Sequence, residues 1–348
     1  MTSASLAHAI AQFENPRGYL AVASIGLPPR ATVEALSADL AAWVDGTHDP
    51  RAFDAVVERS RASYASIAGV AVERVAQGSQ TSVLTSLVAA EVPDGAEVLM
   101  PEGDFSSIQF PFVVLPGVRV RAVPLADLAT SITDETWLVV FSLVQSATGV
   151  IADTDAILEA ADRHGAYTFC DVTQAVGVLP VDAARFDVTV CHTYKWLCAP
   201  RGVAFLTISE RMDALLTPRH AGWYAGQEIW SSTYGPTMSL ASTARRFDVS
   251  PAWTAWAGAE PALALFAGLD IGEVWQRASG LGDALCDGLG IPRQGQAIVT
   301  WPDETGRDLD RLAAAGIRAA GRAGRLRASF HLFNDQSDVD AVVAALRA

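Results

Sequence analysis

The segment FCDVTQAVGVLPVDAARFDVTVCHTYKWLCAPRGVAFL, residues 169–206, contains three short apolar runs that predict buried β-strands. The first run begins two residues before this segment, at residue 167, and ends in the acid Asp171, and Gln174 follows three residues later. The second run, residues 188–191, is followed closely by Lys195 in an aromatic turn. The third, residues 203–206, comes after a Pro-Arg-Gly turn. The segment therefore places one acid and one lysine just beyond two neighbouring strands.

An acid and a lysine in these positions are the two groups that a pyridoxal phosphate site requires. The lysine amine holds the cofactor covalently, and the acid pairs with the protonated pyridine nitrogen, which keeps the ring electron-withdrawing. A lone lysine at a strand end is usually a solvated surface residue, so the prediction depends on the combination. We predict a pyridoxal phosphate enzyme with Lys195 and Asp171 as its catalytic residues, and no metal site.

Length and composition are consistent with a large globular protein. The chain has 348 residues, of which 50% are hydrophobic, so it can bury a large core, and we expect two subdomains. Its formal net charge of −14 argues against nucleic acid and anionic membrane partners. No apolar run reaches transmembrane length, and no secretory signal pattern is visible. The four cysteines have no paired spacing, which is typical of reduced thiols in a cytoplasmic protein.

Short apolar runs alternate with helix-like stretches over the first two thirds of the chain. This alternation predicts an α/β fold with a mostly parallel sheet flanked by helices. The predicted strands are residues 97–100, 118–123, 137–142, 167–171, 188–191 and 203–206, with helices such as 81–91 and 154–163 between them. Later helices at 253–268, 271–289 and 335–347 surround short strands at 297–300 and 326–330. We expect a large cofactor-binding domain at 1–238 and a small α+β domain at 239–348.

Two further motifs are candidates for cofactor contacts. The run QGSQTS, residues 77–82, opens an apolar helix, and its free N–H groups and hydroxyls could receive a phosphate. Alone it is a weak signal, because an ordinary Ser/Thr helix cap looks the same and is the commoner explanation, but upstream of the acid–lysine pair it predicts a phosphate-binding loop. Phe105 follows the predicted strand 97–100 and could stack on the face of a cofactor ring, although a buried core Phe is the commoner explanation.

The order and spacing of these elements resemble the class V aminotransferase superfamily, whose members are fold type I pyridoxal phosphate enzymes. The superfamily includes cysteine desulfurases, kynureninases and C–S lyases. The resemblance extends from Gly26-Leu27-Pro28-Pro29 to the segment 327–334 and is most specific at Asp171-x-x-Gln174 and Tyr194-Lys195. It implies a homodimer with active sites at the subunit interface.

The resemblance also implies roles for individual residues. Asp171 would hold the pyridinium, and Gln174 would contact the ring oxygen. The phosphate contacts would be Ser79, Gln80, His192 and Tyr194. Phe105 falls where relatives stack His or Phe on the ring, and Gln145 falls where many carry Asn. Arg327 matches the arginine that binds the substrate α-carboxylate, for which a forked guanidinium is well suited.

Two departures from the superfamily pattern are informative. Cysteine desulfurases carry a nucleophilic Cys on the loop before this arginine, but residues 316–324 contain none, and Cys286 lies well upstream. A persulfide relay requires a reactive thiolate on a mobile loop, so we do not expect desulfurase activity. Many relatives also present a Gly-Thr pair to the partner's phosphate. Here that region reads RRFDVSPAW, residues 245–253, in which Ser250 could supply the contact.

An aromatic loop suggests the substrate. Four large aromatics, including Trp223 and Tyr224, lie within residues 223–234 and could bind a quaternary ammonium or an imidazolium, or equally pack an interface. The loop and the run 245–253 resemble the ergothioneine-pathway C–S lyases. That resemblance implies β-elimination from hercynylcysteine sulfoxide, with Trp223, Tyr224 and Arg327 binding the substrate. The alternatives are a kynureninase-like hydrolysis, an epimerisation or a transamination, and more remotely a non-enzymatic binding protein.

Overall fold

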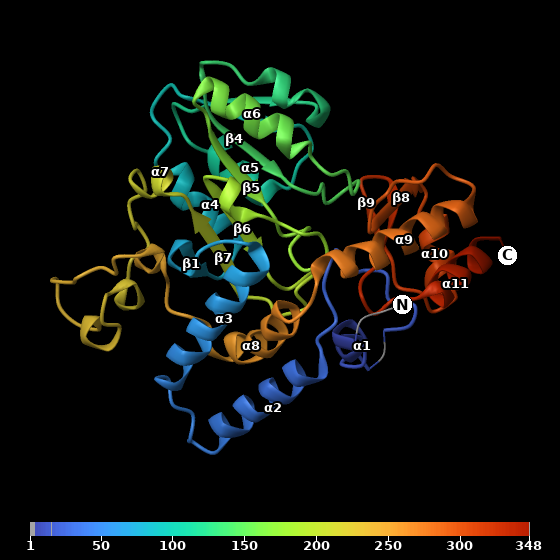
Figure 1. The fold of residues 1–348 in the computed structure, drawn as a ribbon, viewed down its shortest axis with the longest axis horizontal. Helices are drawn as coiled ribbons and strands as arrows, with labels where there is room; N and C mark the ends of the chain where they lie inside the picture. Colours follow the sequence, from blue (N-terminus) through green and yellow to red (C-terminus); the bar gives the residue numbers. More distant parts are fainter. Residues whose placement is uncertain (1–3, 15, 348) are drawn as a thin grey trace.

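A computed structural model describes residues 4–14 and 16–347 (Figure 1). A seven-stranded sheet with the order β1-β7-β6-β5-β4-β2-β3 forms its centre. Its strands are β1 (Val75–Gly78), β2 (Glu97–Pro101), β3 (Arg119–Val123), β4 (Thr136–Ser142), β5 (Tyr167–Asp171), β6 (Val188–His192) and β7 (Ala204–Ile208). Strands β2 to β6 run parallel, whereas β7 is antiparallel to both of its neighbours. The predicted α/β class with a mostly parallel sheet is confirmed.

The central strands are apolar on both faces because helices cover both sides of the sheet. In β4, Leu138 and Val140 point into one hydrophobic cluster, and Val139 and Phe141 point into the other, as the two-residue period of a strand requires. Helices α4 (Thr81–Ala89) and α5 (Ser106–Val113) pack on the first face. Helices α3 (Ala52–Ala68), α6 (Thr154–His164) and α8 (Trp253–Ala267) pack on the second.

A smaller antiparallel sheet follows, with the order β8 (Ile298–Pro302), β10 (Arg325–Ser329) and β9 (Ala320–Arg322). The sheet lies beside α9 (Ile271–Leu289), α10 (Arg307–Ala314) and α11 (Gln336–Arg347) (Figure 1). The N-terminal segment joins it through a parallel bridge from Tyr19 to Arg318 and another from Ala21 to Ser329. Residues from both ends of the chain therefore build this region.

The remaining helices are α1 (Ala4–Ile10), α2 (Arg30–Val44) and the short α7 (Glu210–Asp213). Helix α8, which follows the predicted domain boundary at 238–239, packs against α2 and α3. The boundary itself stays a prediction. Within the described residues, no helix combines the length and the apolar character that a membrane crossing needs.

A buried ion pair holds the edge strand β1 against helix α3. The Arg61 guanidinium of α3 donates to Asp248 Oδ2 at 2.6 Å, and the two side chains are 1% and 0% exposed. Asp248 Oδ1 also accepts from the backbone N–H of Gln77 in β1 at 2.8 Å, and Arg61 Nη1 donates to the Val75 carbonyl at 2.6 Å. One carboxylate thus ties together a helix, an edge strand and the segment after residue 243.

We expect the Asp248→Ala substitution to destabilise the protein by about 3–5 kcal/mol, because it leaves the buried Arg61 charge without its main partner. Urea unfolding would measure the loss. The matched control is Glu159→Ala, which removes an exposed helix-surface pair with Arg163 and should cost no more than about 0.5 kcal/mol. Equal effects of the two substitutions would contradict this account.

Candidate active site

Lys195 and Asp171 meet at one edge of the large sheet. Asp171 is the last residue of β5, and Lys195 lies three residues beyond the end of β6. Because β5 and β6 are adjacent and parallel, their carboxyl ends open at the same edge. Asp171 is 4% exposed and Lys195 5% exposed. The sheet therefore buries an amine and a carboxylate close together, which is the pair that the sequence predicted.

The turn that carries Lys195 is held by an unusually close backbone contact. The Gly26 N–H donates to the Tyr194 carbonyl at 2.8 Å. A Cβ at residue 26 would lie 2.1 Å from the Lys195 carbonyl oxygen, so only glycine fits there. On the other side, Trp196 Nε1 donates to Gln174 Oε1 at 2.8 Å. These contacts fix the lysine turn against the N-terminal segment.

Burial changes the protonation of both groups. It lowers the pKa of Lys195 from 10.5 to about 8, an effect that nearby Asp171 partly opposes. It raises the pKa of Asp171 from 3.8 to about 6, although a hydrogen bond from Thr173 favours the carboxylate. Near pH 7 the site therefore offers an ionised acid and a lysine that readily loses its proton. These are the states needed to hold a pyridinium and to attack an aldehyde.

A small hollow lies in front of Lys195. It is lined by Gln80, Thr81, Ser82, Phe105, Ser107, Thr173, His192, Tyr194, Lys195 and Arg201. Gln80 caps α4 without a side-chain hydrogen bond, so the first N–H groups of that helix face this region. Burial lowers the pKa of His192 to about 4, so its ring is neutral at pH 7. Helix amides, hydroxyls and a guanidinium together suit a phosphate.

Arg201 is a site residue that the sequence analysis did not identify. Its guanidinium lies over the Tyr194 ring, 5.0 Å from the centroid. Its positive charge contributes, after burial, to the lowered pKa of His192. The phosphate contacts implied by the superfamily resemblance include no arginine or lysine. The structure places the guanidinium of Arg201 in the hollow.

Phe105 and its neighbour Asp104 form one side of the hollow. The Phe105 ring lies 5.3 Å from the Lys195 amine, a position from which it could cover a bound ring. The Asp104 carboxylate is buried and accepts from the Ser142 backbone N–H at 2.8 Å and hydroxyl at 2.6 Å. It also accepts from Gln145 Nε2 at 3.0 Å. Asp104, which the sequence analysis missed, therefore positions the Phe105 loop against the end of β4.

Three residues that were predicted to contact the cofactor are not among those that line the hollow. Gln145 is bound to Asp104 and does not line the hollow, and neither does Ser79. Gln174 lies behind the lysine turn, where its amide N–H groups donate to the Ala23 carbonyl and to Ser146 Oγ. Both of its donors are thus engaged within the protein, so contact with a ring oxygen would require a rearrangement. The proposed roles of these residues stay predictions.

Arg327 is buried without an acidic partner among the residues described. Its side chain is 1% exposed on β10 and donates to the Ser146 carbonyl and, at 2.6 Å, to Ser24 Oγ. Its Nε has no hydrogen-bond partner. Burial lowers the pKa of this guanidinium to about 10. A buried charge of this kind is costly until an anion pairs with it, and a substrate carboxylate would do so.

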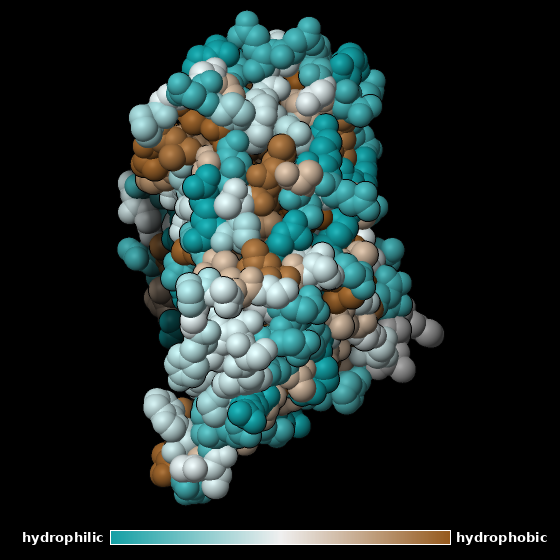
Figure 2. Space-filling view, turned by 90° about the vertical axis from the view of Figure 1, so that its left-hand side faces the viewer, coloured by the Kyte–Doolittle hydropathy of each residue, from teal (hydrophilic) through white to brown (hydrophobic). Residues whose placement is uncertain are grey.

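Trp223 and Tyr224 do not lie beside Lys195 within the chain. Tyr224 donates through its hydroxyl to Asp54 Oδ1 at 3.0 Å, and Trp230 Nε1 donates to Asp54 Oδ2 at 2.6 Å, so the loop packs on the first turn of α3. Figure 2 faces this side of the molecule and shows a mixed surface, with pale areas of intermediate hydropathy in the lower part and hydrophobic patches among hydrophilic residues above. The reason is the antiparallel β7, which carries the chain away from the edge of the sheet where Lys195 lies.

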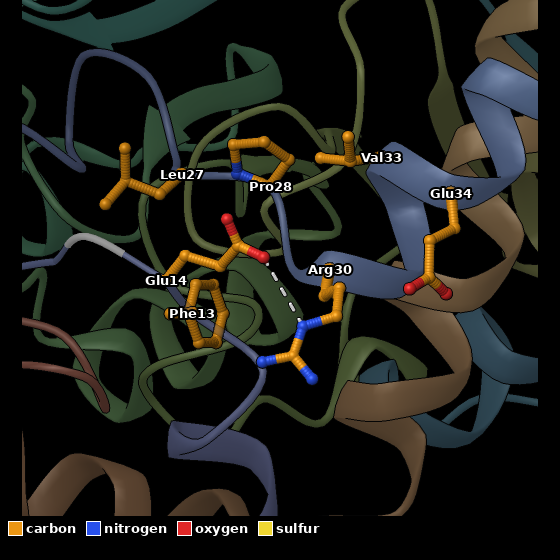
Figure 3. A pocket seen from close by; sticks show the side chains of 7 residues that line it. All are labelled: Phe13, Glu14, Leu27, Pro28, Arg30, Val33 and Glu34. Atoms are coloured by element: carbon orange, nitrogen blue, oxygen red, sulfur yellow. Dashed lines mark ion pairs between the residues drawn. The ribbon is translucent and has the colours of Figure 1, made fainter.

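A larger cavity, of about 350 Å³, lies near the N-terminal segment (Figure 3). Its lining comes from the segment before α2 and from the first turn of that helix: Phe13, Glu14, Leu27, Pro28, Arg30, Val33 and Glu34. Arg30 and Glu14 form an ion pair across it at 3.5 Å. The described residues that line this cavity include no lysine and no unpaired guanidinium, so we assign the chemistry to the smaller hollow beside Lys195.

Comparisons with known proteins show the family of this chain. The family described as Aminotransferase class-V matches residues 48–305. The kynureninase of Deinococcus radiodurans is 29% identical over 80% of this chain and 73% of its own length. An uncharacterized aminotransferase of Bacillus subtilis, YcbU, is also 29% identical, over 46% of this chain. The match spans 42% of YcbU, less than half of that protein.

Solved structures share the fold. A variant of C-DES with glycine covalently linked to the PLP cofactor superposes with a TM-score of 0.86 at 20% identity, covering 97% of this chain and 98% of that one. The cysteine desulfurase CsdA of Escherichia coli gives 0.84 at 20% identity, over 99% and 98% of the two chains. Taken with the family match, these findings identify pyridoxal phosphate as the cofactor. The buried acid, the lysine and the hollow fit that group.

Lys195 is also the only lysine in the 348-residue sequence. This simple count is a signal that motif reasoning had not used. A cofactor that binds covalently to a lysine side chain can bind nowhere else in this protein. All other basic side chains of the sequence belong to arginines and histidines.

The lowered pKa of Lys195 predicts how cofactor binding depends on pH. Neutral amine is the reactive form, and lowering the pKa from 10.5 to about 8 raises its fraction at pH 7 by roughly 300-fold. We expect the association rate of pyridoxal phosphate with the apo-protein to rise about tenfold from pH 6 to 7 and to level off above about pH 8. Stopped-flow absorbance would measure it. A rate that keeps rising towards pH 10 would contradict the lowered pKa.

Arg201 should contribute to phosphate affinity. The Arg201→Gln variant removes a charge-assisted hydrogen bond, so we expect the Kd of pyridoxal phosphate to rise about tenfold or more. Quenching of tryptophan fluorescence in the apo-protein gives this constant independently of catalysis. The control is Arg163→Gln, at an exposed ion pair on α6, which should bind as the wild type does. An unchanged Kd in Arg201→Gln would show that Arg201 does not bind the phosphate.

Proposed function

The chain belongs to the aminotransferase class-V family, and from this premise we propose that it is a pyridoxal phosphate-dependent carbon–sulfur lyase. The proposed reaction is β-elimination on hercynylcysteine sulfoxide, a cysteine sulfoxide that carries a trimethylated histidine. Its products are the sulfenic acid of ergothioneine, pyruvate and ammonia. The sulfenic acid must then be reduced to the thione by a separate step.

The burial of every cysteine is the observation that supports a lyase reaction over a desulfurase reaction. Cys170, Cys191, Cys198 and Cys286 are all buried. Burial raises the pKa of each thiol, the opposite of what a nucleophilic thiolate needs. Elimination requires no protein thiol, because the leaving sulfur belongs to the substrate. The residues therefore support C–S cleavage over a persulfide relay.

Arg327 supports an α-amino acid as the substrate. Its unpaired guanidinium lies close enough to Lys195 to lower the pKa of that amine, after burial, so both act on one small region. A carboxylate bound to Arg327 would direct the neighbouring α-carbon towards Lys195. An amine or a substrate without a carboxylate would leave the buried guanidinium unpaired.

Different residues of this chain can perform the separate tasks that the elimination requires. Bound pyridoxal phosphate would supply an electron-withdrawing ring that stabilises negative charge at the α-carbon. Asp171 would keep the ring nitrogen protonated, and Phe105 would cover the ring face. Lys195 would accept the α-proton, for which a pKa of about 8 is well matched to neutral pH. The C–S bond then breaks, and its electron pair leaves with the sulfur.

The specific substrate rests on the aromatic loop and on the run 245–253. A loop rich in Trp and Tyr suits a trimethylammonium group. Trp230 is 36% exposed and Tyr234 90% exposed, so this loop presents aromatic surface outward. We propose that the protein is a homodimer and that this loop serves the substrate site across the subunit interface, with the half-buried Trp223 in contact with the substrate and the buried Tyr224 holding the loop through Asp54.

A kynureninase-like hydrolysis is the second candidate, favoured by the 29% identity to the Deinococcus radiodurans kynureninase over 80% of this chain. It would begin with the same lysine, acid and arginine. The two reactions differ in products, since hydrolysis of kynurenine yields anthranilate and alanine, whereas elimination yields pyruvate.

The test is to incubate the cofactor-loaded protein with hercynylcysteine sulfoxide and to follow pyruvate by coupled lactate dehydrogenase. We expect rapid pyruvate release that is lost in Lys195→Ala, because that variant has no lysine to take the α-proton. A parallel assay with kynurenine should give no anthranilate fluorescence. Anthranilate without pyruvate would replace the lyase by the hydrolase.

A further inference from the structure

Two arginines of the small sheet converge on one serine. Arg327 Nη2 donates to Ser24 Oγ at 2.6 Å, and Arg322 Nη2 donates to the same oxygen at 3.3 Å. Arg322 is paired across the hairpin with Arg325, so by the two-residue period all three arginines share one face. Arg325 is engaged with Thr300. Arg322 and Arg327 form no ion pair with any acid in the described part of the chain.

The hairpin holds Arg322 in a defined place. The two residues between β9 and β10 are Ala323, with φ of 47°, and Gly324, with φ of 71°. Positive φ at both positions is typical of the tight turn that joins two antiparallel strands. Alanine adopts this conformation at a cost, so the turn is kept despite local strain. The result is a short strand that ends in the exposed Arg322, whose guanidinium reaches Ser24 beside the buried Arg327.

The charge of Arg322 acts on the site. After burial, it is a cause of the lowered pKa of Arg327, and it contributes with Arg327 to the lowered pKa of Lys195. Two like charges on one hydroxyl repel each other, and no acid of the described residues offsets them. An anionic or strongly hydrogen-bond-accepting ligand would relieve that repulsion.

The spacing fits one small substrate. Because both Nη2 atoms are bonded to the same oxygen, they lie less than about 6 Å apart. In a cysteine sulfoxide, the carboxylate carbon and the sulfur are three bonds apart, so their oxygens lie roughly 3–5 Å from each other. A substrate whose carboxylate binds Arg327 therefore brings its sulfinyl oxygen within reach of Arg322.

We propose that Arg322 binds the sulfinyl oxygen of the substrate and stabilises the sulfenate that leaves during elimination. This inference rests on the proposed function. In the step, the α-proton moves to the Lys195 amine, the C–H pair forms the new carbon–carbon double bond, and the C–S pair moves to sulfur. The departing group is the anion R–S–O⁻, whose oxygen accepts from the guanidinium and then takes a proton to give the sulfenic acid. No external oxidant or reductant takes part.

Arg322 lies in the segment from which the nucleophilic cysteine of the desulfurases is absent. The segment 316–324, in which cysteine desulfurases carry their nucleophile, here ends next to the substrate carboxylate site with a guanidinium. A guanidinium cannot attack sulfur, but it can stabilise negative charge on an oxygen attached to sulfur. The substrate class that matches it is the S-oxidised cysteine conjugates rather than the corresponding thioethers.

The experiment compares two substrates that share the α-carboxylate but differ in leaving group. Pyruvate release is measured from hercynylcysteine sulfoxide and from β-chloro-L-alanine, whose leaving chloride has no oxygen. In Arg322→Gln we expect kcat/KM for the sulfoxide to fall about 100-fold, as for loss of one oxyanion donor, while that for β-chloro-L-alanine changes less than about threefold. Arg327→Gln should lower both, because both substrates carry the carboxylate.

Arg318→Gln is the matched control. It removes an exposed guanidinium from the same segment that has no contact with Ser24, and it should leave both rates unchanged. Equal losses for the two substrates in Arg322→Gln, or no loss for either, would overturn the assignment while leaving the lyase activity in place. A wild-type protein that releases pyruvate from β-chloro-L-alanine but not from the sulfoxide would instead overturn the proposed function, and this inference with it.

Discussion

The burial of one amine beside one carboxylate is the interaction on which the rest of this structure depends. Lys195 and Asp171 are brought together because β5 and β6 are adjacent, parallel and end at the same edge. Removing both from water moves the pKa of each towards neutrality, to about 8 and about 6. The close approach of Gly26 keeps the lysine turn in place. A surface lysine would have neither the reactivity nor the orientation that the cofactor needs.

Three arginines lie close to this pair, although the protein is acidic. The chain carries a formal net charge of −14, yet the hollow beside Lys195 includes Arg201, and Arg322 and Arg327 meet at Ser24 near the same lysine. Pyridoxal phosphate and an amino-acid substrate are both anions, with a phosphate at one end and a carboxylate at the other. Arg201 lies in the hollow with Lys195, and Arg322 and Arg327 lie close enough to Lys195 to lower the pKa of its amine, so arginines are available for both anionic groups. Electrostatics therefore orients cofactor and substrate as well as binding them.

Much of this could be predicted from the sequence, because the decisive groups lie directly after apolar strands. The strand positions and the acid–lysine pair follow from local pattern, and the cofactor and fold are confirmed. The direction of β7 was not predicted, although residues 193–203 are too few for the helical crossover that a parallel strand requires. Without that direction, the sequence could not show that Trp223 and Tyr224 lie away from Lys195 within their own chain. Asp104 and Ser24 were missed because their partners are distant in sequence, and β9 lacks the β-branched residues that mark a strand.

The central claim is that this protein binds pyridoxal phosphate covalently at Lys195, and the single lysine of the chain makes the test unusually direct. The loaded protein is reduced with borohydride, its intact mass is measured, and the modified peptide is sequenced. The account predicts one cofactor adduct per chain, located on Lys195 and absent from Lys195→Arg. No adduct in the wild type, or an adduct that persists in the variant, would contradict it.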